Sequence, residues 1–337
     1  MHEALFYQRM GDGRVTCGLC HHQCQIRPGR RGLCGVRENR DGVLVSLVYG
    51  ELVAEHVDPI EKKPLLHFLP TSRAYSISTV GCNFFCRHCQ NSDISQFSHA
   101  SSNEIPGVMR RPDQVVAEAL RLHCASVCYT YVEPTIFFEF ALDCAVLARK
   151  EGLKNVFVSN GYMMPEVTRQ LSGVLDGINI DIKAFTDDFY QQVCKAHLQP
   201  VLENVRLFHE LGVWVEVTTL LIPGLNDSED ELRQLARFIH SVSPTIPWHV
   251  TAFYPTYKMT DRPPTPIASL RRAREIGLEE GLSFVYEGNI PGGGGEDTSC
   301  PDCGKTLIRR HGFQVQENRL KKACCGGCGR QIAGVWC

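Results

Sequence analysis

The sequence predicts an α/β fold in which a parallel sheet curves into a partial (β/α)6 TIM-like barrel, with a cysteine-rich segment on either side. Three observations predict this arrangement. After residue 70, short β-branched runs alternate with longer amphipathic stretches, which is typical of β–α units around a parallel sheet. About six such units fit the chain, fewer than the eight of a closed barrel. Most of the 17 cysteines fall into three clusters, one before these units, one within the first and one after the last.

Seven segments are strand candidates, and the helices between them have recognisable starts. Pro112 stands at a first-turn position, Thr186 precedes two aspartates, and Ser228 with Glu231 three residues later forms a capping box. In sheets of this type the chemistry lies where the strands end. The strand candidates are residues 74–79, 125–130, 154–159, 177–182, 214–220, 248–253 and 283–286.

We expect three parts along the chain. Residues 1–70 form an N-terminal cysteine-rich metal-binding segment, residues 71–290 form the partial barrel, and residues 296–337 form a zinc-ribbon-like module. Residues 291–295 are one proline and four glycines, a run that cannot propagate a regular element and therefore indicates a linker.

Composition narrows the classes of protein. With 337 residues, of which 43% are apolar, the chain can bury a substantial core. No stretch approaches the roughly 18 apolar residues of a membrane span, and the first residues lack the pattern of a signal peptide. A net charge of −2 argues against nucleic acid as an obligatory partner. Many cysteines without a secretory signal favour metal binding over disulfides, so we expect a cytoplasmic location.

The most specific motif lies in residues 78–91. Cys82, Cys86 and Cys89 have the spacing C-x3-C-x2-C, directly after the first barrel strand. A [4Fe-4S] cluster needs a thiolate on each iron to be saturated, and the next cysteine comes only 35 residues later, in a different β–α unit. The motif therefore predicts a cluster with one open iron. The alternative is a chance loop of cysteines that binds zinc with His88.

At this motif the chain resembles the radical S-adenosylmethionine (SAM) superfamily. In that superfamily SAM binds the open iron, and an electron from the cluster cleaves it to methionine and a 5′-deoxyadenosyl radical. The resemblance implies a [4Fe-4S] cluster, SAM, and a reductant such as ferredoxin or flavodoxin. It is closest to the AmmeMemoRadiSam-system radical SAM enzymes, relatives of the pyruvate formate-lyase activating enzymes, which are associated with Memo-like and AMMECR-type proteins. The segments that carry it are residues 35–37, 58–65, 82–91, 131–135, 179–184 and 222–227, with the terminal cysteine pairs.

The resemblance also implies contacts to SAM at the strand ends. Glu133 stands where the superfamily has a Gly-Gly-Glu segment, whose glycines this chain lacks, and would hold the SAM amino group. Its alternative is a helix-start carboxylate. Asn160 is a further contact; Asp181 would bind ribose hydroxyls and Lys183 the SAM carboxylate, unless the last two form a buried ion pair. His249 is either a SAM contact or a structural histidine.

At the C-terminal end, two C-x2-C-G knuckles supply four thiolates, which suit a closed tetrahedral zinc site. Rubredoxin-like iron is the alternative. Cys324 has the wrong offset and is left out of the predicted site. The four predicted ligands are Cys300, Cys303, Cys325 and Cys328.

Near the N-terminus, four cysteines with the spacing C-x2-C-x3-C-x9-C also predict a metal site. Zinc and a second iron–sulfur cluster fit this spacing about equally. The predicted ligands are Cys17, Cys20, Cys24 and Cys34. The scattered cysteines are expected to be small buried hydrophobic residues; they are Cys124, Cys128, Cys144, Cys194 and Cys337.

We therefore expect a radical SAM enzyme that abstracts hydrogen from a substrate the sequence does not identify. A second interpretation is an activase that acts on a backbone glycine of a partner protein. Against it, the fifth strand carries Glu216, Thr218 and Thr219 where activases tend to have a basic residue. A third interpretation, a non-catalytic multi-metal scaffold, is disfavoured by the open-iron spacing of the central cysteines.

Overall fold

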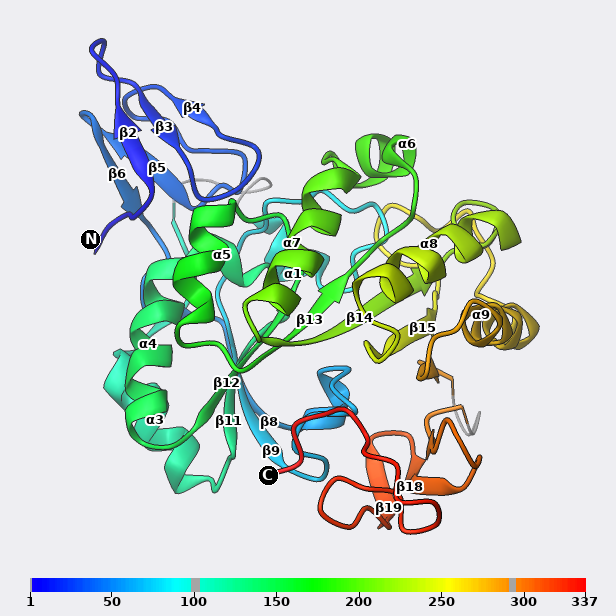
Figure 1. The fold of residues 1–337 in the computed structure, drawn as a ribbon. Helices are drawn as coiled ribbons and strands as arrows, with labels where there is room; N and C mark the ends of the chain where they lie inside the picture. Colours follow the sequence, from blue (N-terminus) through cyan, green and yellow to red (C-terminus); the bar gives the residue numbers. More distant parts are fainter. Residues whose placement is uncertain (1, 98–103, 291–294) are drawn as a thin grey trace.

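A mostly parallel sheet of eight strands forms the centre of the computed structural model, which describes residues 2–97, 104–290 and 295–337 (Figure 1). Its strand order is β16-β15-β14-β13-β12-β11-β9-β8. Only β8 runs antiparallel to its neighbour within this sheet. The strands are β8 (Ala54–Pro59), β9 (Arg73–Ser78), β11 (Ser126–Tyr129), β12 (Lys154–Ser159), β13 (Gly177–Asp181), β14 (Trp214–Leu221), β15 (Trp248–Ala252) and β16 (Val285–Gly288).

The seven predicted strands are all present, and their ends lie within two residues of the prediction. The eighth strand, β8, falls inside the predicted N-terminal segment. Its residues do not alternate between buried and exposed positions, so the sequence carries no clear strand signal there. The central sheet therefore takes a strand from upstream of residue 70, and the three-part division stays a prediction.

Helices follow most of the parallel strands, and α3, α4, α7 and α9 pack against the sheet. Pro112 is the first residue of its helix, as predicted. The Ser228 hydroxyl accepts the N–H of Glu231 at 3.3 Å, but the Glu231 carboxylate binds the N–H of Phe185, so only half of the predicted capping box forms. The longer helices are α3 (Pro112–Arg121), α4 (Phe138–Lys150), α5 (Pro165–Ser172), α7 (Leu198–Glu210), α8 (Glu229–Val242) and α9 (Ile267–Glu279). The short elements are α1 (Ser92–Ser95), α6 (Asp187–Phe189), η1 (Ile60–Lys62), η2 (Pro134–Phe137) and η3 (Tyr190–Cys194).

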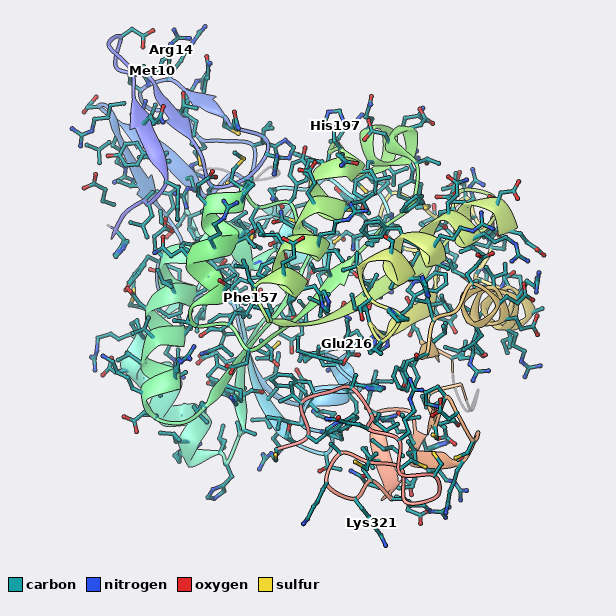
Figure 2. The ribbon with its side chains drawn as sticks, in the orientation of Figure 1. Met10, Arg14, Phe157, His197, Glu216 and Lys321 are labelled. Atoms are coloured by element: carbon teal, nitrogen blue, oxygen red, sulfur yellow. The ribbon has the colours of Figure 1, made fainter. Side chains whose placement is uncertain are left out.

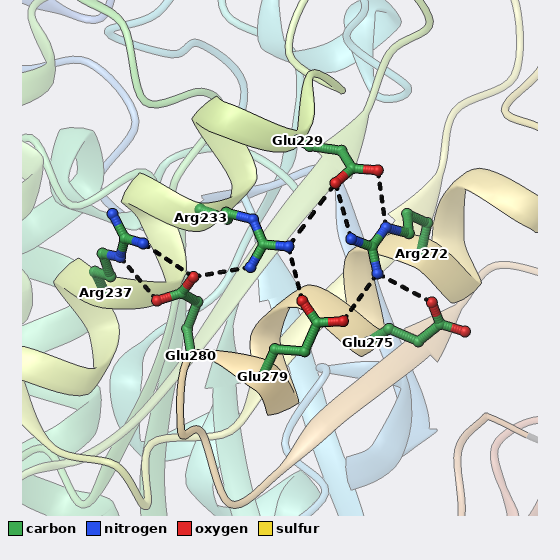
Figure 3. Close-up of polar contacts among 7 residues, drawn as sticks. All are labelled: Glu229, Arg233, Arg237, Arg272, Glu275, Glu279 and Glu280. Carbon is green, nitrogen blue, oxygen red and sulfur yellow. Dashed lines mark hydrogen bonds and ion pairs between the residues drawn. The ribbon is translucent and has the colours of Figure 1, made fainter.

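A network of ion pairs joins α8 to α9 at the surface (Figure 3). Arg272 contacts both Glu229 and Glu279, and Arg233 contacts Glu279 and Glu280. Exposed pairs contribute little individually, whereas shared charges in a network fix the two helices relative to each other. This network lies among helices and has no site residue in it, so we assign it a structural role.

Two small antiparallel sheets form the N-terminal segment, drawn in blue at the upper left of Figure 1. A buried ion pair between Arg37 and Glu139 of α4, 2.9 Å long, fastens the segment to the central fold. Arg37 also donates to the carbonyl of Leu5. One sheet contains β1 (His2–Glu3), β6 (Val43–Ser46) and β5 (Arg37–Arg40), and the other contains β2 (Tyr7–Arg9), β3 (Val15–Cys17) and β4 (Gln25–Ile26). A separate pair joins β7 (Glu51–Leu52) to β10 (Val108–Met109).

The C-terminal residues form a three-stranded antiparallel sheet of β17 (Thr298–Ser299), β18 (Thr306–His311) and β19 (Gln314–Asn318). It lies at the opposite end of the molecule from the N-terminal sheets, as the labels on Met10 and Lys321 show (Figure 2). Arg310 donates to the carbonyl of Leu66, and His67 Nδ1 donates to that of Ala333. Of the predicted linker, residues 291–294 lie outside the described residues. No helix of the described chain is long and apolar enough to cross a membrane.

Candidate active site

The loop that follows β9 carries the three central cysteines. Gly81 begins it with a φ of +95°, a conformation that favours glycine. A Cβ built on Gly81 would lie 2.8 Å from the carbonyl oxygen of Cys34 and 2.6 Å from Cγ1 of Val36. The glycine is therefore required because the N-terminal segment packs directly on the cysteine loop.

All three thiols of this loop are wholly or partly buried. Cys86 is buried, and Cys82 and Cys89 are half-buried. Burial raises the pKa of Cys82 and of Cys89; for Cys86 the hydrogen bond with the Cys194 thiol is the first cause and burial the second. Buried thiolates need a bound cation, and soft sulfur donors suit iron or zinc. The donor set therefore fits a metal group.

The spacing of the sulfurs separates a cluster from a single ion. Within the described ranges, the C-terminal cysteines alone bring three or more Cys, His, Asp or Glu ligand atoms within 4.8 Å of one another. The sulfurs of Cys82, Cys86 and Cys89 do not all lie within that distance of one another, and ligands of different irons stand farther apart than ligands of a single ion. His88 is buried, and its Nδ1 has no hydrogen-bond partner in the described chain. The alternative of one zinc ion held with His88 has no support in this geometry.

Glu133 lies at the carboxyl end of β11 and is only 3% exposed. Its Oε1 accepts from the backbone and hydroxyl of Thr135 and from Ser159 Oγ, and its Oε2 accepts from the Asn160 N–H at 2.7 Å. It is the N-cap residue of η2. The geometry therefore favours the alternative interpretation of a capping carboxylate, and the contact to the SAM amino group stays a prediction.

Asn160 connects Glu133 to the cysteine loop. Its side-chain Nδ2 donates to Oδ1 of Asn83 at 2.7 Å, and Asn83 is the residue after Cys82. Asn83 in turn leaves its own Nδ2 buried without a partner in the described chain. Thr218 has a second buried, unpartnered polar atom, Oγ1. Because buried polar atoms normally have hydrogen-bond partners, Asn83 Nδ2 and Thr218 Oγ1 fit a site where a polar ligand supplies them.

Asp181 and Lys183 form the ion pair that the sequence analysis gave as an alternative, with 2.6 Å between Oδ2 and Nζ. The pair lies close to the cysteine loop. Burial lowers the pKa of Lys183, but the Asp181 carboxylate and the thiols of Cys86 and Cys194 raise it above its ordinary value. Asp181 keeps 30% of its side chain exposed, so the pair borders an accessible space. The SAM contacts of Asp181 and Lys183 stay predictions.

His249 lies on the same face of the sheet as Asp181, because the strand register aligns both with Thr218. Its Nε2 donates to Glu216 Oε2 at 2.6 Å. Glu216 lies toward the C-terminal module (Figure 2) and is completely buried. The carboxylate also accepts from the N–H groups of Leu66, His67 and Trp214 Nε1. This network favours a structural histidine, and a SAM contact for His249 stays a prediction.

Two neighbours of the loop were missed by the sequence analysis. Cys194 was predicted to be a small buried filler, yet its thiol lies beside Cys86 and raises the pKa of that thiol, and its carbonyl accepts the N–H of Phe85 at 2.9 Å. His22 Nε2 donates to the carbonyl of Asn83 at 2.7 Å. Both contacts join segments that are far apart in sequence, so no local pattern signals them.

The C-terminal cysteines form a compact four-thiol site. Cys300 and Cys328 Sγ are 3.6 Å apart, and Cys303 and Cys325 Sγ are 3.7 Å apart. The Gly327 N–H donates to Cys325 Sγ, and backbone N–H groups lower the pKa of Cys325 to about 6. Four thiolates around one ion at about 2.3 Å have sulfurs separated by about 3.8 Å. The arrangement therefore matches a single-ion site.

The comparisons with known proteins agree with this geometry. The family profile "Radical SAM superfamily" matches residues 76–239. An uncharacterized protein of Methanocaldococcus jannaschii is 45% identical over 335 residues, 98% of this chain and 99% of that protein. This chain belongs to the radical SAM superfamily. It is a radical SAM enzyme, and its family implies [4Fe-4S] and SAM binding.

More distant similarities extend to an activating enzyme and to a solved structure. The pyruvate formate-lyase-activating enzyme of Streptococcus mutans is 23% identical over 173 residues, 48% of this chain and 64% of that enzyme. The structure of Streptococcus suis SuiB bound to S-adenosylmethionine has a TM-score of 0.51 and 14% identity, covering 68% of this chain and 53% of SuiB. SuiB shares the fold alone. The resemblance to the AmmeMemoRadiSam-system enzymes stays a prediction.

Proposed function

We propose that this enzyme binds a [4Fe-4S] cluster on Cys82, Cys86 and Cys89 and abstracts hydrogen from an unidentified substrate. The observation that carries the proposal is the loop after β9, whose three buried or half-buried thiols do not all lie within the 4.8 Å of one another that a single-ion site requires. When bound, the cluster and SAM supply the electron and the C5′–S bond whose cleavage gives methionine and a 5′-deoxyadenosyl radical. The protein residues hold, orient and shield these groups.

Three thiolates leave one iron of a cubane open. Cys194 does not provide the missing ligand in this proposal, because its thiol contacts the sulfur of Cys86. Once Cys86 is a thiolate on iron, the neighbouring Cys194 thiol would donate a hydrogen bond to that ligand sulfur. The loop packs against the N-terminal segment at Gly81 and Asn83.

For SAM, we propose that Lys183 binds the carboxylate and Asp181 the ribose hydroxyls. Their ion pair borders the cysteine loop, and Asp181 retains accessible surface. Asn160 would contact SAM from the neighbouring strand end, beside the unpartnered Nδ2 of Asn83. Glu133 then acts by fixing the Asn160 backbone, and His249 would contact SAM through its Nδ1, because its Nε2 is bonded to Glu216.

The proposal extends to the surrounding fold, the C-terminal module and the partners. The parallel strands form a partial (β/α)6 barrel, and residues 296–337 form a zinc-ribbon-like module whose four thiolates bind zinc. Many reduced thiols require a reducing compartment, which supports a cytoplasmic location. A ferredoxin or flavodoxin would supply electrons. Memo-like and AMMECR-type proteins are candidate partners, to be tested by co-purification.

A second candidate function is activation of a glycyl-radical enzyme, in which the hydrogen comes from a backbone glycine of a partner protein. The similarity to the pyruvate formate-lyase-activating enzyme favours it. Glu216, which stands where activases tend to have a basic residue, is fully engaged in buried hydrogen bonds. This difference from the activases favours a substrate other than a backbone glycine.

The test begins with anaerobically reconstituted protein, dithionite and SAM. We expect 5′-deoxyadenosine and methionine, and their complete loss in Cys82→Ala, Cys86→Ala and Cys89→Ala. The matched control is Cys144→Ala, which removes a buried thiol of α4 and should retain activity. Full activity in any of the three loop variants contradicts the proposal. Transfer of deuterium from labelled metabolites or labelled partner proteins into 5′-deoxyadenosine then distinguishes the two substrate classes.

A further inference from the structure

We propose that Cys17, Cys20, Cys24 and Cys34 bind a second [4Fe-4S] cluster, which passes electrons from an external reductant to the cluster on the central loop. The binding site stands on the geometry of the N-terminal segment alone. The electron-transfer role rests on the proposed function, because the central cluster is the destination of the electron.

The spacing of the four sulfurs distinguishes a cluster from zinc. In the C-terminal site the paired sulfurs are 3.6 and 3.7 Å apart, as one tetrahedral ion requires. No three ligand atoms of the N-terminal cysteines and their neighbouring histidines meet the 4.8 Å limit that the C-terminal site meets, within the residues described. A cubane places each thiolate on a different iron and therefore holds the sulfurs farther apart.

The N-terminal cysteines share one cavity with a buried positive charge. All four line the same cavity, so their side chains converge on one space between the N-terminal segment and the central fold. Arg37 also lines this cavity; it is 1% exposed, and its Nε is buried without a hydrogen-bond partner in the described chain. A tetrathiolate cluster carries net negative charge, so a buried guanidinium with a free donor is a suitable counter-charge.

The cavity shares a wall with the central cysteine loop. Asn83 lines it and is adjacent in sequence to Cys82. His22, between two of the N-terminal cysteines, donates to the carbonyl of Asn83 at 2.7 Å. The carbonyl of Cys34 lies so close to Gly81 that a Cβ there would be 2.8 Å from it. Short covalent and hydrogen-bonded paths therefore connect the two sets of ligands.

Ligation by four thiolates indicates electron transfer as the role. Such a cluster has no open iron for SAM or substrate. It would take one electron from a one-electron donor protein of the iron–sulfur or flavin class, and it would return to its oxidised state on giving that electron to the central cluster. Residues 2–50 contain seven arginines and four carboxylates, and Arg27 and Arg30 are exposed, so an acidic donor fits this surface.

Metal content of the intact, anaerobically reconstituted enzyme tests the binding site without any variant. We expect about eight irons and one zinc per chain, from two clusters and the C-terminal ion. About four irons and two zincs would overturn the second cluster. The double variant Cys17→Ser/Cys20→Ser should lose about four irons and keep the electron paramagnetic resonance (EPR) signal that SAM perturbs. Unchanged iron content in this variant would also overturn the site.

Reduction kinetics test the relay. The SAM-perturbed EPR signal is followed after mixing with reduced flavodoxin or with dithionite, in the wild-type enzyme and the double variant. We expect reduction by flavodoxin to be slower by roughly tenfold or more in the variant, with dithionite reduction changed by less than about twofold, because the small reductant needs no relay. Equal flavodoxin rates would overturn the relay. Failure of the proposed function is distinguishable, since it appears as wild-type enzyme that forms no SAM-perturbed signal and no 5′-deoxyadenosine.

Discussion

The two terminal cysteine sites contain the same number of thiols but differ in how the chain arranges them. At the C-terminus, two C-x2-C-G knuckles face each other, and their backbone N–H groups already point at sulfur. At the N-terminus, four cysteines are distributed around a cavity that also contains a buried arginine. The number of thiols therefore does not identify the metal that a site binds. The separation of the sulfurs and the charge around them do so.

The two modules also attach to opposite ends of the central sheet. The C-terminal module binds the segment around Leu66 and His67, and His67 continues through the Tyr286 hydroxyl to Thr298. The N-terminal segment binds the loops after β9 and β12, where the strands end and the chemistry lies. We therefore expect substitutions in the C-terminal module to lower stability. Substitutions in the N-terminal segment should change iron content and electron transfer.

The largest expected effect comes from the double variant Cys300→Ser/Cys303→Ser. Zinc binding to such sites is worth about 10–16 kcal/mol at neutral pH, far more than a module of this size gains from its small core. Residues 296–337 should lose their zinc and unfold, while the central iron remains. Hydrogen exchange and metal analysis measure both quantities.

The matched control for this variant is Cys324→Ser. Cys324 neighbours a knuckle cysteine in sequence but is absent from the four-thiol group, so its replacement should leave zinc and exchange protection unchanged. Loss of central iron from Cys300→Ser/Cys303→Ser, or zinc loss from the control, would contradict a purely structural role for the C-terminal site.

Next in size is Arg37→Met, which removes one partner of the buried pair with Glu139. Leaving a buried carboxylate uncompensated costs about 3–5 kcal/mol of unfolding free energy. Denaturant unfolding should show this loss, together with fewer irons at the N-terminal site. The double variant Arg37→Met/Glu139→Leu removes both charges and should recover part of the stability. No recovery would mean that Arg37 acts through its contact with Leu5 or with the cavity.

Much of the fold could be predicted because its signals are local. The strands are short apolar runs bounded by turn residues, and all seven predicted ones are present. The edge strand β8 gave no alternation and was missed. The half-formed cap at Ser228 shows the limit of motif reasoning, because the Glu231 carboxylate finds a better-placed N–H on Phe185, 46 residues away in sequence.

The candidate site could be predicted to the level of the cysteines and no further. Loop spacing alone brings Cys82, Cys86 and Cys89 together. Glu133 and His249 form hydrogen bonds with residues near or on other strands. Their partners are far away in sequence, so no local pattern could have predicted these contacts. The roles of Cys194 and His22 likewise depend on tertiary packing.

A smaller effect is expected from Glu133→Gln, at the strand ends beside the N-terminal segment. Glutamine has one acceptor oxygen where glutamate has two. With that oxygen kept for Thr135 and Ser159, the amide nitrogen faces the Asn160 N–H, and this buried donor loses its partner at a cost of about 1–3 kcal/mol. We expect a lower melting temperature and a loss of SAM affinity below about tenfold, equivalent to 1.4 kcal/mol. The matched control is Glu61→Gln, a buried carboxylate at the other end that accepts the Thr71 N–H. A loss of SAM affinity above tenfold with unchanged melting would assign Glu133 to SAM.

The smallest effect concerns Cys194. Its variants test whether this thiol has only a structural role or also tunes the reduction potential of the central cluster. With Cys86 bound to iron as a thiolate, the neighbouring Cys194 S–H is the donor, and a weak hydrogen bond of this kind stabilises the reduced, more negative cluster, so Cys194→Ala should lower its reduction potential. A bond of about 0.5–1.5 kcal/mol corresponds to roughly 20–60 mV for one electron. Cys194→Ser keeps a donor and should shift the potential less, and Cys144→Ala should not shift it. An EPR-monitored redox titration resolves these differences. If Cys194→Ala instead loses iron, Cys194 is a fourth ligand, and the open position on which SAM binding depends is not available at this site.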